Sequence, residues 1–154
     1  MNQIQEIPVT VPGGNIPVLI AKDNIPFVWP MVEPRLQIII DKQEFVDFDL
    51  PHVYNLLLLE QAQLWIAGSG EMIMITRIGN YPNGVKRLIV DFIQGTNYKN
   101  YKEHMEYIEH WAVQLGATQA EAEIQPGLEK FLIKEQGWKR RRVKIFKHLS
   151  RGLH

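Results

Sequence analysis

The sequence predicts an α+β fold: a mixed, mostly antiparallel sheet with helices on both faces, preceded by an N-terminal β-hairpin extension. Three apolar runs, 63–67, 72–78 and 85–93, are separated only by turns, and such runs form an antiparallel meander. The third run is followed by an expected helix over 100–115 and a strand over 118–124. A strand–helix–strand crossover makes its two strands parallel, so the sheet should be mixed.

Composition limits the class of protein. The chain has 154 residues, of which 45% are apolar and 22% charged, as in a single soluble globular domain. It has no cysteine, which excludes a disulfide framework, a thiolate nucleophile and a cysteine-ligated metal. We see no signal peptide and no apolar run of membrane-spanning length, so we expect a cytoplasmic protein without a membrane partner.

The N-terminus predicts a β-hairpin. Two β-rich runs, 7–11 and 16–21, flank the turn sequence Pro-Gly-Gly-Asn. We therefore assign residues 1–17 to an extension and residues 18–154 to the domain. An edge hairpin of this kind can pair with a neighbouring subunit.

Two helices should follow the hairpin. Asp23 and Asn24 can cap the first helix, but Pro30 and Pro34 predict that it is broken. Asp49 can cap the second helix, over 50–60.

The second half of the chain predicts two more helices and a last strand. Apolar residues fall at helical spacing between 100 and 115, namely at Tyr101, Met105, Ile108, Ala112 and Leu115. Residues 128–136 form a helix that Gly137 ends, and 138–149 form a final strand. At the end of the run 85–93, a polar turn leads into a helix N-terminus, a geometry that can hold an anion such as a pyrophosphate.

Charge is unevenly distributed, although the formal net charge is zero. Residues 1–60 hold eight acids and three bases, whereas residues 139–154 hold seven bases and no acid. Such polarity can attract an anionic partner or an acidic surface, or the basic tail is simply solvated. We expect protein partners or self-association through the hairpin and the tail. A neutral chain without a recognised module does not favour nucleic acid.

Four strings carry a family resemblance. FVWPMVEP at 27–34 and EQAQLWIA at 60–67 are similar to segments of GNAT-like proteins encoded by bacteriophages. EHWAVQLGA at 109–117 is similar to the end of the helix after an acetyl-CoA loop, and the ending at 125–149 is similar to a final helix, Gly-aromatic turn and strand. Together with the element order over 18–149, these strings resemble the GNAT N-acetyltransferase superfamily.

The resemblance implies an acetyl-CoA site where the central strand meets the next helix. The family motif there is Q/R-x-x-G-x-G/A, and only Gln94 and Gly95 match it in kind. Tyr98 and Tyr101 add bulk where the family has little. The residues that would contact the cofactor are Phe92, Ile93, Gln94, Gly95, Thr96 and Asn97.

The resemblance also implies where the catalytic groups would lie. The family's tyrosine acid, four residues before the Gly-aromatic turn, corresponds to Ile133, which has no proton to donate. Asp91 is a candidate general base; alternatively it forms a structural ion pair with a nearby base such as Arg87.

Two functions therefore remain open. One is an acetyl-CoA-dependent N-acetyltransferase acting on an amine or protein acceptor. The other is a phage component that keeps the fold without the chemistry, associated with the virion or its assembly and found in the host cytoplasm or the virion. The missing glycines and Ile133 favour the second.

A metal site is not expected. His104 and His110 lie six residues apart on one predicted helix and do not share a face. Glu103, Glu106 and Glu109 have the spacing of a solvated helix face.

Overall fold

The computed structural model describes residues 16–42, 49–95, 101–123 and 126–143, together with residues 145, 147 and 149. The chain divides into two compact units, residues 1–124 and residues 125–154. The first unit contains the sheet, and the second contains one helix and the basic tail.

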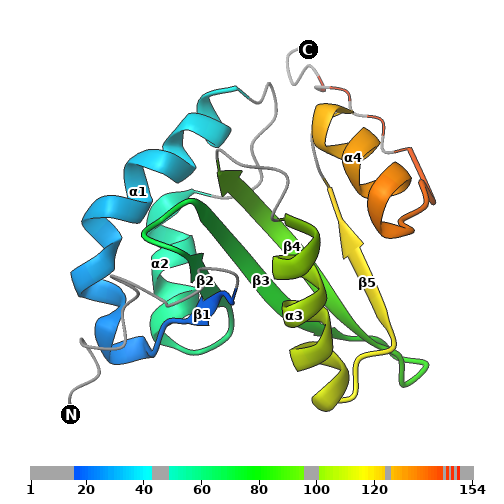
Figure 1. Cartoon of the computed structure of the whole chain (residues 1–154), viewed down its shortest axis with the longest axis horizontal. Helices are drawn as coiled ribbons and strands as arrows, with labels where there is room; N and C mark the ends of the chain where they lie inside the picture. Colours follow the sequence, from blue (N-terminus) through cyan, green and yellow to red (C-terminus); the bar gives the residue numbers. More distant parts are fainter. Residues whose placement is uncertain are drawn as a thin grey trace. The chain divides into compact units, whose positions relative to one another are not determined.

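The first unit is built on a five-stranded sheet in the order β1-β2-β3-β4-β5 (Figure 1). Its strands are β1 (Val18–Leu19), β2 (Gln63–Ala67), β3 (Met72–Asn80), β4 (Lys86–Gly95) and β5 (Gln119–Ala122). Neighbouring strands are antiparallel except β4 and β5, which are parallel. The predicted meander and crossover are both confirmed.

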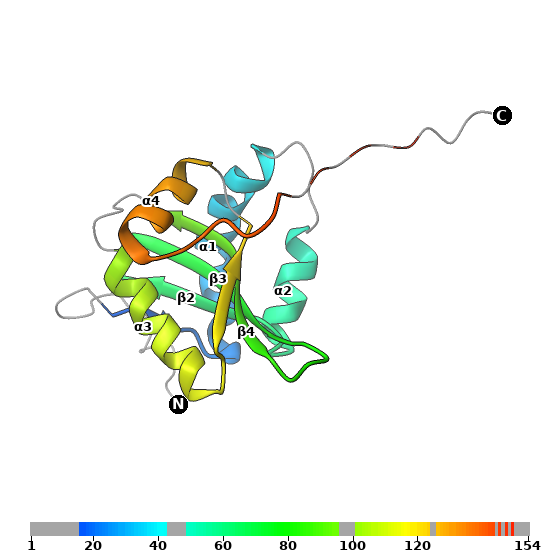
Figure 2. The same ribbon diagram turned by 90° about the vertical axis from the view of Figure 1, so that its right-hand side faces the viewer.

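Helices cover both faces of the sheet, as the sequence predicts (Figure 2). The helices are η2 (Lys22–Asn24), α1 (Ile25–Asp41), α2 (Leu50–Leu58) and α3 (Tyr101–Gln114). α1 and α2 share a core with Leu64, Ile66, Ile73, Ile75 and Phe92 of the sheet. Trp65 points to the opposite face, because side chains alternate along a strand, and meets the rings of Tyr107 and Trp111 on α3.

The prediction that the first helix is broken is wrong. α1 runs without interruption from Ile25 to Asp41 and contains Pro30 and Pro34. Pro26, Pro30 and Pro34 recur every four residues, and all three are exposed. The prolines therefore share the solvent face of α1, where water can bind the carbonyl groups that lose a helical hydrogen bond.

α2 begins as the sequence predicts. Its N-cap is Asp49, whose carboxylate accepts a hydrogen bond of 2.8 Å from the backbone N–H of His52. The helix ends at Leu58, and Leu59 is exposed.

α3 buries most of its predicted apolar stripe. Tyr101, Met105, Ile108 and Ala112 are buried, but Leu115 lies beyond the helix end and is 47% exposed. Under α3 the indole of Trp65 donates to Thr76 Oγ1 at 3.0 Å, and Thr76 donates in turn to Gln63 Oε1 at 2.8 Å. This chain of hydrogen bonds satisfies the indole N–H of Trp65 and the hydroxyl of Thr76 in the core of this face.

The second unit contains α4 (Pro126–Gln136), which ends before Gly137 with its positive φ of 74°, as predicted. Arg140 folds back on the helix and forms a bidentate pair with Glu129, at 2.6 and 2.8 Å. This hydrogen bond lowers the pKa of Glu129 and raises that of Arg140.

The predicted last strand over 138–149 is wrong for the residues that the structure describes. Residues 138–143, 145, 147 and 149 form neither helix nor strand. A strand needs a neighbour to accept its backbone hydrogen bonds, and the sheet of the described residues ends at β5.

The N-terminal hairpin prediction is tested only in part. Its first run and its turn lie outside the described residues. The second run supplies β1, which pairs with β2. Among the described helices, none combines the length and apolar character that a membrane span requires.

Candidate functional site

β4 carries a β-bulge at its centre. Phe92 lies opposite Ile75 of β3 and Val90 lies opposite Thr76, so Asp91 has no partner of its own. Residues directly opposite each other share a face of a sheet. The bulge therefore turns Phe92 to the α1–α2 face, although Val90, two residues earlier, points to the α3 face.

The bulge also marks where β5 stops pairing with β4. β5 pairs with Arg87–Val90 alone, and the two strands diverge beyond that point (Figure 1). We call Asp91–Gly95 the open half of β4, because no described residue of β5 pairs with it. On the side of β4 that faces β5, the backbone N–H and C=O groups of this segment form no ladder with the described residues of β5.

Gln94 and Gly95 have neighbours that the sequence did not reveal. Gln94 points to the α1–α2 face, where its Oε1 accepts a hydrogen bond of 2.5 Å from Arg35 Nε on α1. Arg35 also donates to the carbonyl of Gly70, and burial lowers the pKa of its guanidinium. Gln94 is thus tied to α1.

Gly95 points to the α3 face, and the space beside it is filled. A Cβ added there would lie 2.5 Å from the carbonyl oxygen of Glu71 and would meet the hydroxyl of Tyr101 even more closely. The glycine is needed because protein atoms approach it. The predicted contact residues Thr96 and Asn97 lie outside the described residues.

His104, considered from the sequence only as a candidate metal ligand, lies in the core beside this site, a position that was not predicted. His104 on α3 is fully buried, and its Nε2 lies 3.5 Å from Glu71 Oε1. The signal was present, because His104 falls three residues after Tyr101 on the apolar stripe. It is a core residue next to the strand end, and the described residues contain no group of side chains arranged to hold a metal ion.

Asp91, the candidate base, is held in an ion pair. Its carboxylate accepts two hydrogen bonds from Arg77 on β3, at 2.5 Å to Nε and 3.1 Å to Nη2. Only 10% of the Asp91 side chain is exposed, and the hydrogen bond raises the pKa of Arg77. Of the two roles considered for Asp91, the structure therefore shows the structural ion pair, with Arg77 as its partner. Arg87 instead binds Glu121, at 3.0 Å.

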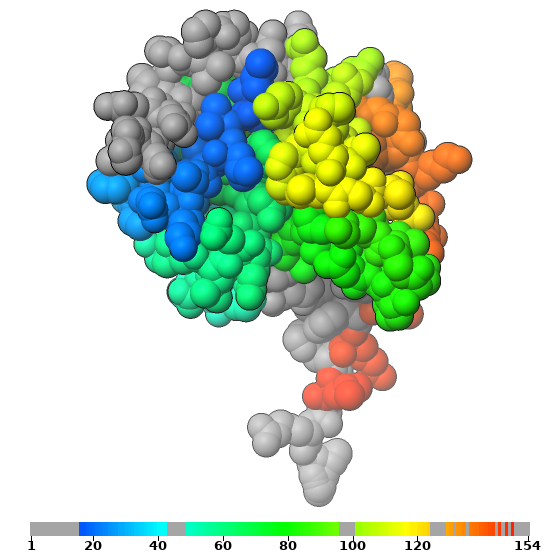
Figure 3. All heavy atoms as spheres, turned by 90° about the horizontal axis from the view of Figure 1, so that it is seen from below, coloured from blue at the N-terminus to red at the C-terminus, as the bar shows by residue number. Residues whose placement is uncertain are grey.

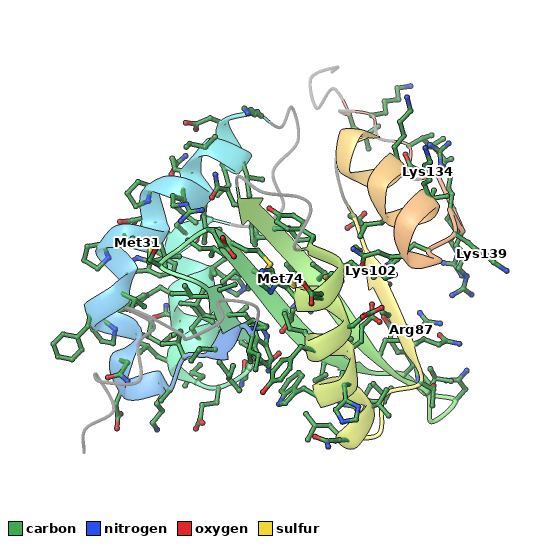
Figure 4. The ribbon with its side chains drawn as sticks, in the orientation of Figure 1. Met31, Met74, Arg87, Lys102, Lys134 and Lys139 are labelled. Carbon is green, nitrogen blue, oxygen red and sulfur yellow. The ribbon has the colours of Figure 1, made fainter. Side chains whose placement is uncertain are left out.

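Among the described residues, the first turn of α3 supplies the first positive charge that follows the open half in sequence. Lys102 is exposed there (Figure 4). A helix N-terminus with an adjacent lysine attracts a phosphate group.

No protein-family model and no curated protein sequence matches the chain. Solved structures do match it. An aminoglycoside acetyltransferase from an uncultured soil metagenomic sample superimposes with a TM-score of 0.65 at 10% identity, over 87% of this chain and 95% of that one. The chain has the fold of GNAT-type acetyltransferases.

Two further structures give the same result. A ribosomal-protein-alanine N-acetyltransferase from Brucella melitensis matches with a TM-score of 0.62 at 13% identity, over 87% of this chain and 98% of that one. A putative acetyl transferase from Pyrococcus furiosus matches with a TM-score of 0.59 at 14% identity, over 86% and 98% of the two chains. Neither these matches nor the first one links the chain to a bacteriophage protein.

Proposed function

We propose that this protein binds acetyl-CoA and transfers the acetyl group to an amine. The observation that carries the proposal is the open half of β4. The bulge at Asp91 and the end of pairing at Val90 leave a strand edge in the centre of a sheet, where a strand edge is normally covered.

The chemistry of the cofactor fits such an edge. Acetyl-CoA supplies an activated acetyl thioester on an extended arm that contains two amide groups. An extended, amide-bearing chain can pair with the free edge of a strand in the way that a bound peptide does. The open half of β4 can therefore bind the arm, and a backbone N–H near the bulge can polarise the thioester carbonyl.

The phosphates fit less well at Gly95, because Tyr101 and Glu71 fill the space beside it. We therefore assign phosphate recognition to the first turn of α3 and to Lys102, and not to Gly95. Phe92 and Gln94 point to the α1–α2 face, so their contribution to cofactor binding is through the backbone.

A second candidate is a GNAT-fold protein without transfer chemistry, acting in assembly. Two observations favour it: Asp91 is held by Arg77, and Ile133, at the position of the family's acid, has an exposed apolar side chain. The phage and virion part of this alternative rests on the sequence resemblance alone.

Calorimetric titration with acetyl-CoA and with coenzyme A, at low and at raised salt, tests the proposal. We expect saturable micromolar binding that survives salt. Lys102→Glu should weaken it about tenfold, since a phosphate contact is replaced by repulsion. The matched control is Lys22→Glu on η2, which makes the same charge change elsewhere and should alter the dissociation constant less than about twofold.

Absence of binding at millimolar ligand would overturn the proposal and leave the assembly function. Binding with no acetyl transfer in a screen of amine acceptors would support the cofactor site and contradict the transfer step.

A further inference from the structure

An apolar stripe runs along the exposed side of α1. Phe27, Met31 and Ile38 are 63%, 39% and 46% exposed, and the exposed Pro34 lies between the last two. We call these four residues the α1 stripe. They follow one another at intervals of four, three and four residues, which places them on one side of a helix. The same intervals separate the apolar residues in the seam of a coiled coil.

The α1 stripe is not the side of α1 that packs on the sheet. The side chains that α1 buries in the core are those of Ile25, Val28, Val32 and Leu36. Figure 3 shows the segment that leads into α1, in blue, at the surface, and Figure 4 labels Met31 on the helix. A helix that already buries one apolar side and exposes a second one indicates contact with another molecule.

The α1 stripe also lacks charge, although its surroundings do not. Fifteen acids and eight bases give residues 1–124 a net charge of −7 with histidine neutral, so the charged surfaces of two first units repel each other. Between residues 24 and 40 the charged residues are Glu33 and Arg35 alone. Arg35 is bound to the sheet, and Glu33, two residues after Met31, lies on another side of the helix. An apolar contact without charges is typical of the core of an interface between identical subunits.

The α1 stripe has the same spacing in both directions. Its midpoint lies between positions 32 and 33, from which Phe27 and Ile38 are equally distant, as are Met31 and Pro34. When two α1 helices lie antiparallel about this midpoint, Phe27 of each copy lies level with Ile38 of the other. Met31 then lies level with Pro34. Every apolar residue of the stripe therefore meets an apolar residue of a second copy.

The ends of the stripe carry opposite charges at matching distances. Asp23 lies four residues before Phe27, Lys42 lies four residues after Ile38, and both are exposed. The antiparallel arrangement brings Asp23 of each copy level with Lys42 of the other, so that two ion pairs form. A parallel arrangement would bring like charges together. The charges therefore favour the antiparallel arrangement, and they favour a second copy because an unrelated protein has no reason to share this symmetry.

We propose that the α1 stripe is a dimer interface, in which α1 of one copy packs antiparallel on α1 of a second copy. The interface is isologous, since both copies contribute the same surface. The inference goes beyond the proposed function, because no residue of the stripe belongs to the open half of β4. The stripe is also separate from the hairpin and the tail, whose partner contacts stay predictions.

The size of the stripe sets the expected affinity. The 17 residues of α1 offer a contact of about 25 by 10 Å on each copy. This area is well below the roughly 800 Å² per partner of a standard interface. We therefore expect a weak, reversible dimer with a dissociation constant of about 10–100 μM.

Cross-linking tests the orientation, because the chain has no cysteine of its own. One preparation carries Phe27→Cys, and a second, tagged preparation carries Ile38→Cys. On mild oxidation we expect disulfides between the two preparations to form about tenfold faster than within either one, since only antiparallel helices bring these Cβ atoms within bonding reach. Glu33→Cys, exposed on another side of α1, is the matched control and should react with Phe27→Cys about tenfold more slowly than Ile38→Cys does.

Two results of the cross-linking would overturn the proposal. One is equal reaction of Glu33→Cys and Ile38→Cys with the Phe27→Cys preparation. The other is a disulfide between two copies of Phe27→Cys that forms as fast as the mixed one, which would indicate parallel helices or random encounters.

Sedimentation equilibrium of the full chain provides a second test. We expect reversible dimerisation of the 17.9 kDa chain. Phe27→Glu places a charge in the apolar contact and should raise the dimer dissociation constant about tenfold or more. The matched control is Leu59→Glu, since Leu59 is similarly exposed, at 65%, but follows α2. It should change the dissociation constant less than about twofold.

Exchange of the end charges tests the register. Asp23→Lys brings like charges together at both ends of the antiparallel pair and should raise the dissociation constant about fivefold. Lys42→Asp on the same chain exchanges the two charges and should restore the parent value. In a parallel pair, Asp23→Lys would only replace one repulsion by another. A monomer up to millimolar concentration, or a dimer unaffected by both Phe27→Glu and Asp23→Lys, would contradict the proposal.

Discussion

The two halves of β4 differ in what surrounds them. Residues Arg87–Val90 pair with β3 on one side and with β5 on the other, whereas Phe92–Gly95, beyond the bulge at Asp91, pair with β3 and with no described residue of β5. The first half is the ordinary interior of a sheet. The second half keeps the central position but has one edge free of β5, and the residues named for the cofactor begin there.

One inserted residue produces the difference. Asp91 has no residue opposite it on β3. Every later side chain of β4 therefore faces the side of the sheet opposite to the one that strict alternation would give. Gln94 thereby reaches Arg35 on α1, and Gly95 reaches Tyr101 on α3. A single bulge thus lies where pairing with β5 ends and sets which helix each later residue of β4 meets.

The largest effect should come from filling the end of the open half. Gly95→Ala places a methyl group against the carbonyl oxygen of Glu71 at 2.5 Å and against the Tyr101 hydroxyl. Overpacking against backbone should lower the free energy of unfolding by about 2–3 kcal/mol. Urea denaturation monitored by tryptophan fluorescence measures the change.

The matched control lies opposite the paired half. A methyl group at Gly79 would lie 2.7 Å from Cδ1 of Ile89, the end of a flexible side chain that can move aside. Gly79→Ala should therefore cost less than about 1 kcal/mol. Equal losses at Gly79 and Gly95 would show that the end of the open half is no more tightly packed than the rest of the sheet.

The next effect concerns the bulge itself. In a double-mutant cycle, Asp91→Asn and Arg77→Gln should each lower stability, with a coupling energy of about 1–2 kcal/mol. We place the coupling below that of a fully buried pair because 33% of the Arg77 side chain is exposed. Chemical denaturation of the four proteins at neutral pH measures it.

The same cycle tests the role of Asp91 in any acetyl transfer. A carboxylate that Arg77 holds for structure predicts that Asp91→Asn keeps transfer within about threefold at a temperature where both proteins are folded. A loss of a hundredfold or more, with the fold intact, would instead identify Asp91 as the general base.

Local sequence patterns predicted most helices and strands. The features that they did not predict depend on how residues far apart in the sequence pair in the sheet. Turn residues and apolar periodicity located β2, β3, β4, α2 and α3 within a few residues. They could not reveal the bulge, because whether Asp91 has a partner depends on the register with β3. The ion pair with Arg77 and the contact between Gln94 and Arg35 both follow from that register.

Two other errors have physical causes of the same kind. The spacing of Pro30 and Pro34 places both on the solvent face of α1. Whether a proline breaks this helix therefore depends on the face on which it lies, and not on its presence alone. The last strand has the right alternation, but a strand forms only beside a partner, which the sequence of one chain does not show.

The smallest effect concerns α3, which connects the open end of β4 to the paired start of β5. Burial, with a smaller contribution from Glu106, raises the pKa of Glu109 above its ordinary value of 4.5. A raised pKa means that the folded state disfavours the charged form. The resulting stability is therefore present below about pH 4.5 and is lost as the pH rises through the folded-state pKa. Glu109→Gln should match the parent protein at pH 4 and exceed it at pH 7, by at most about 0.5 kcal/mol, since Glu109 is only half-buried.

The control for this last change lies in the first turn of the same helix. Glu103 is exposed there, where a negative charge is favourable beside the helix N-terminus, so Glu103→Gln should slightly lower stability at pH 7. The sign of the change therefore distinguishes the two positions. A gain for Glu103→Gln as large as that for Glu109→Gln would mean that general charge repulsion within the acidic first unit, and not burial of Glu109 on α3, sets the pH dependence. In that case the polar face of α3, which connects β4 to β5, would be as solvated along its length as the spacing of its glutamates predicts.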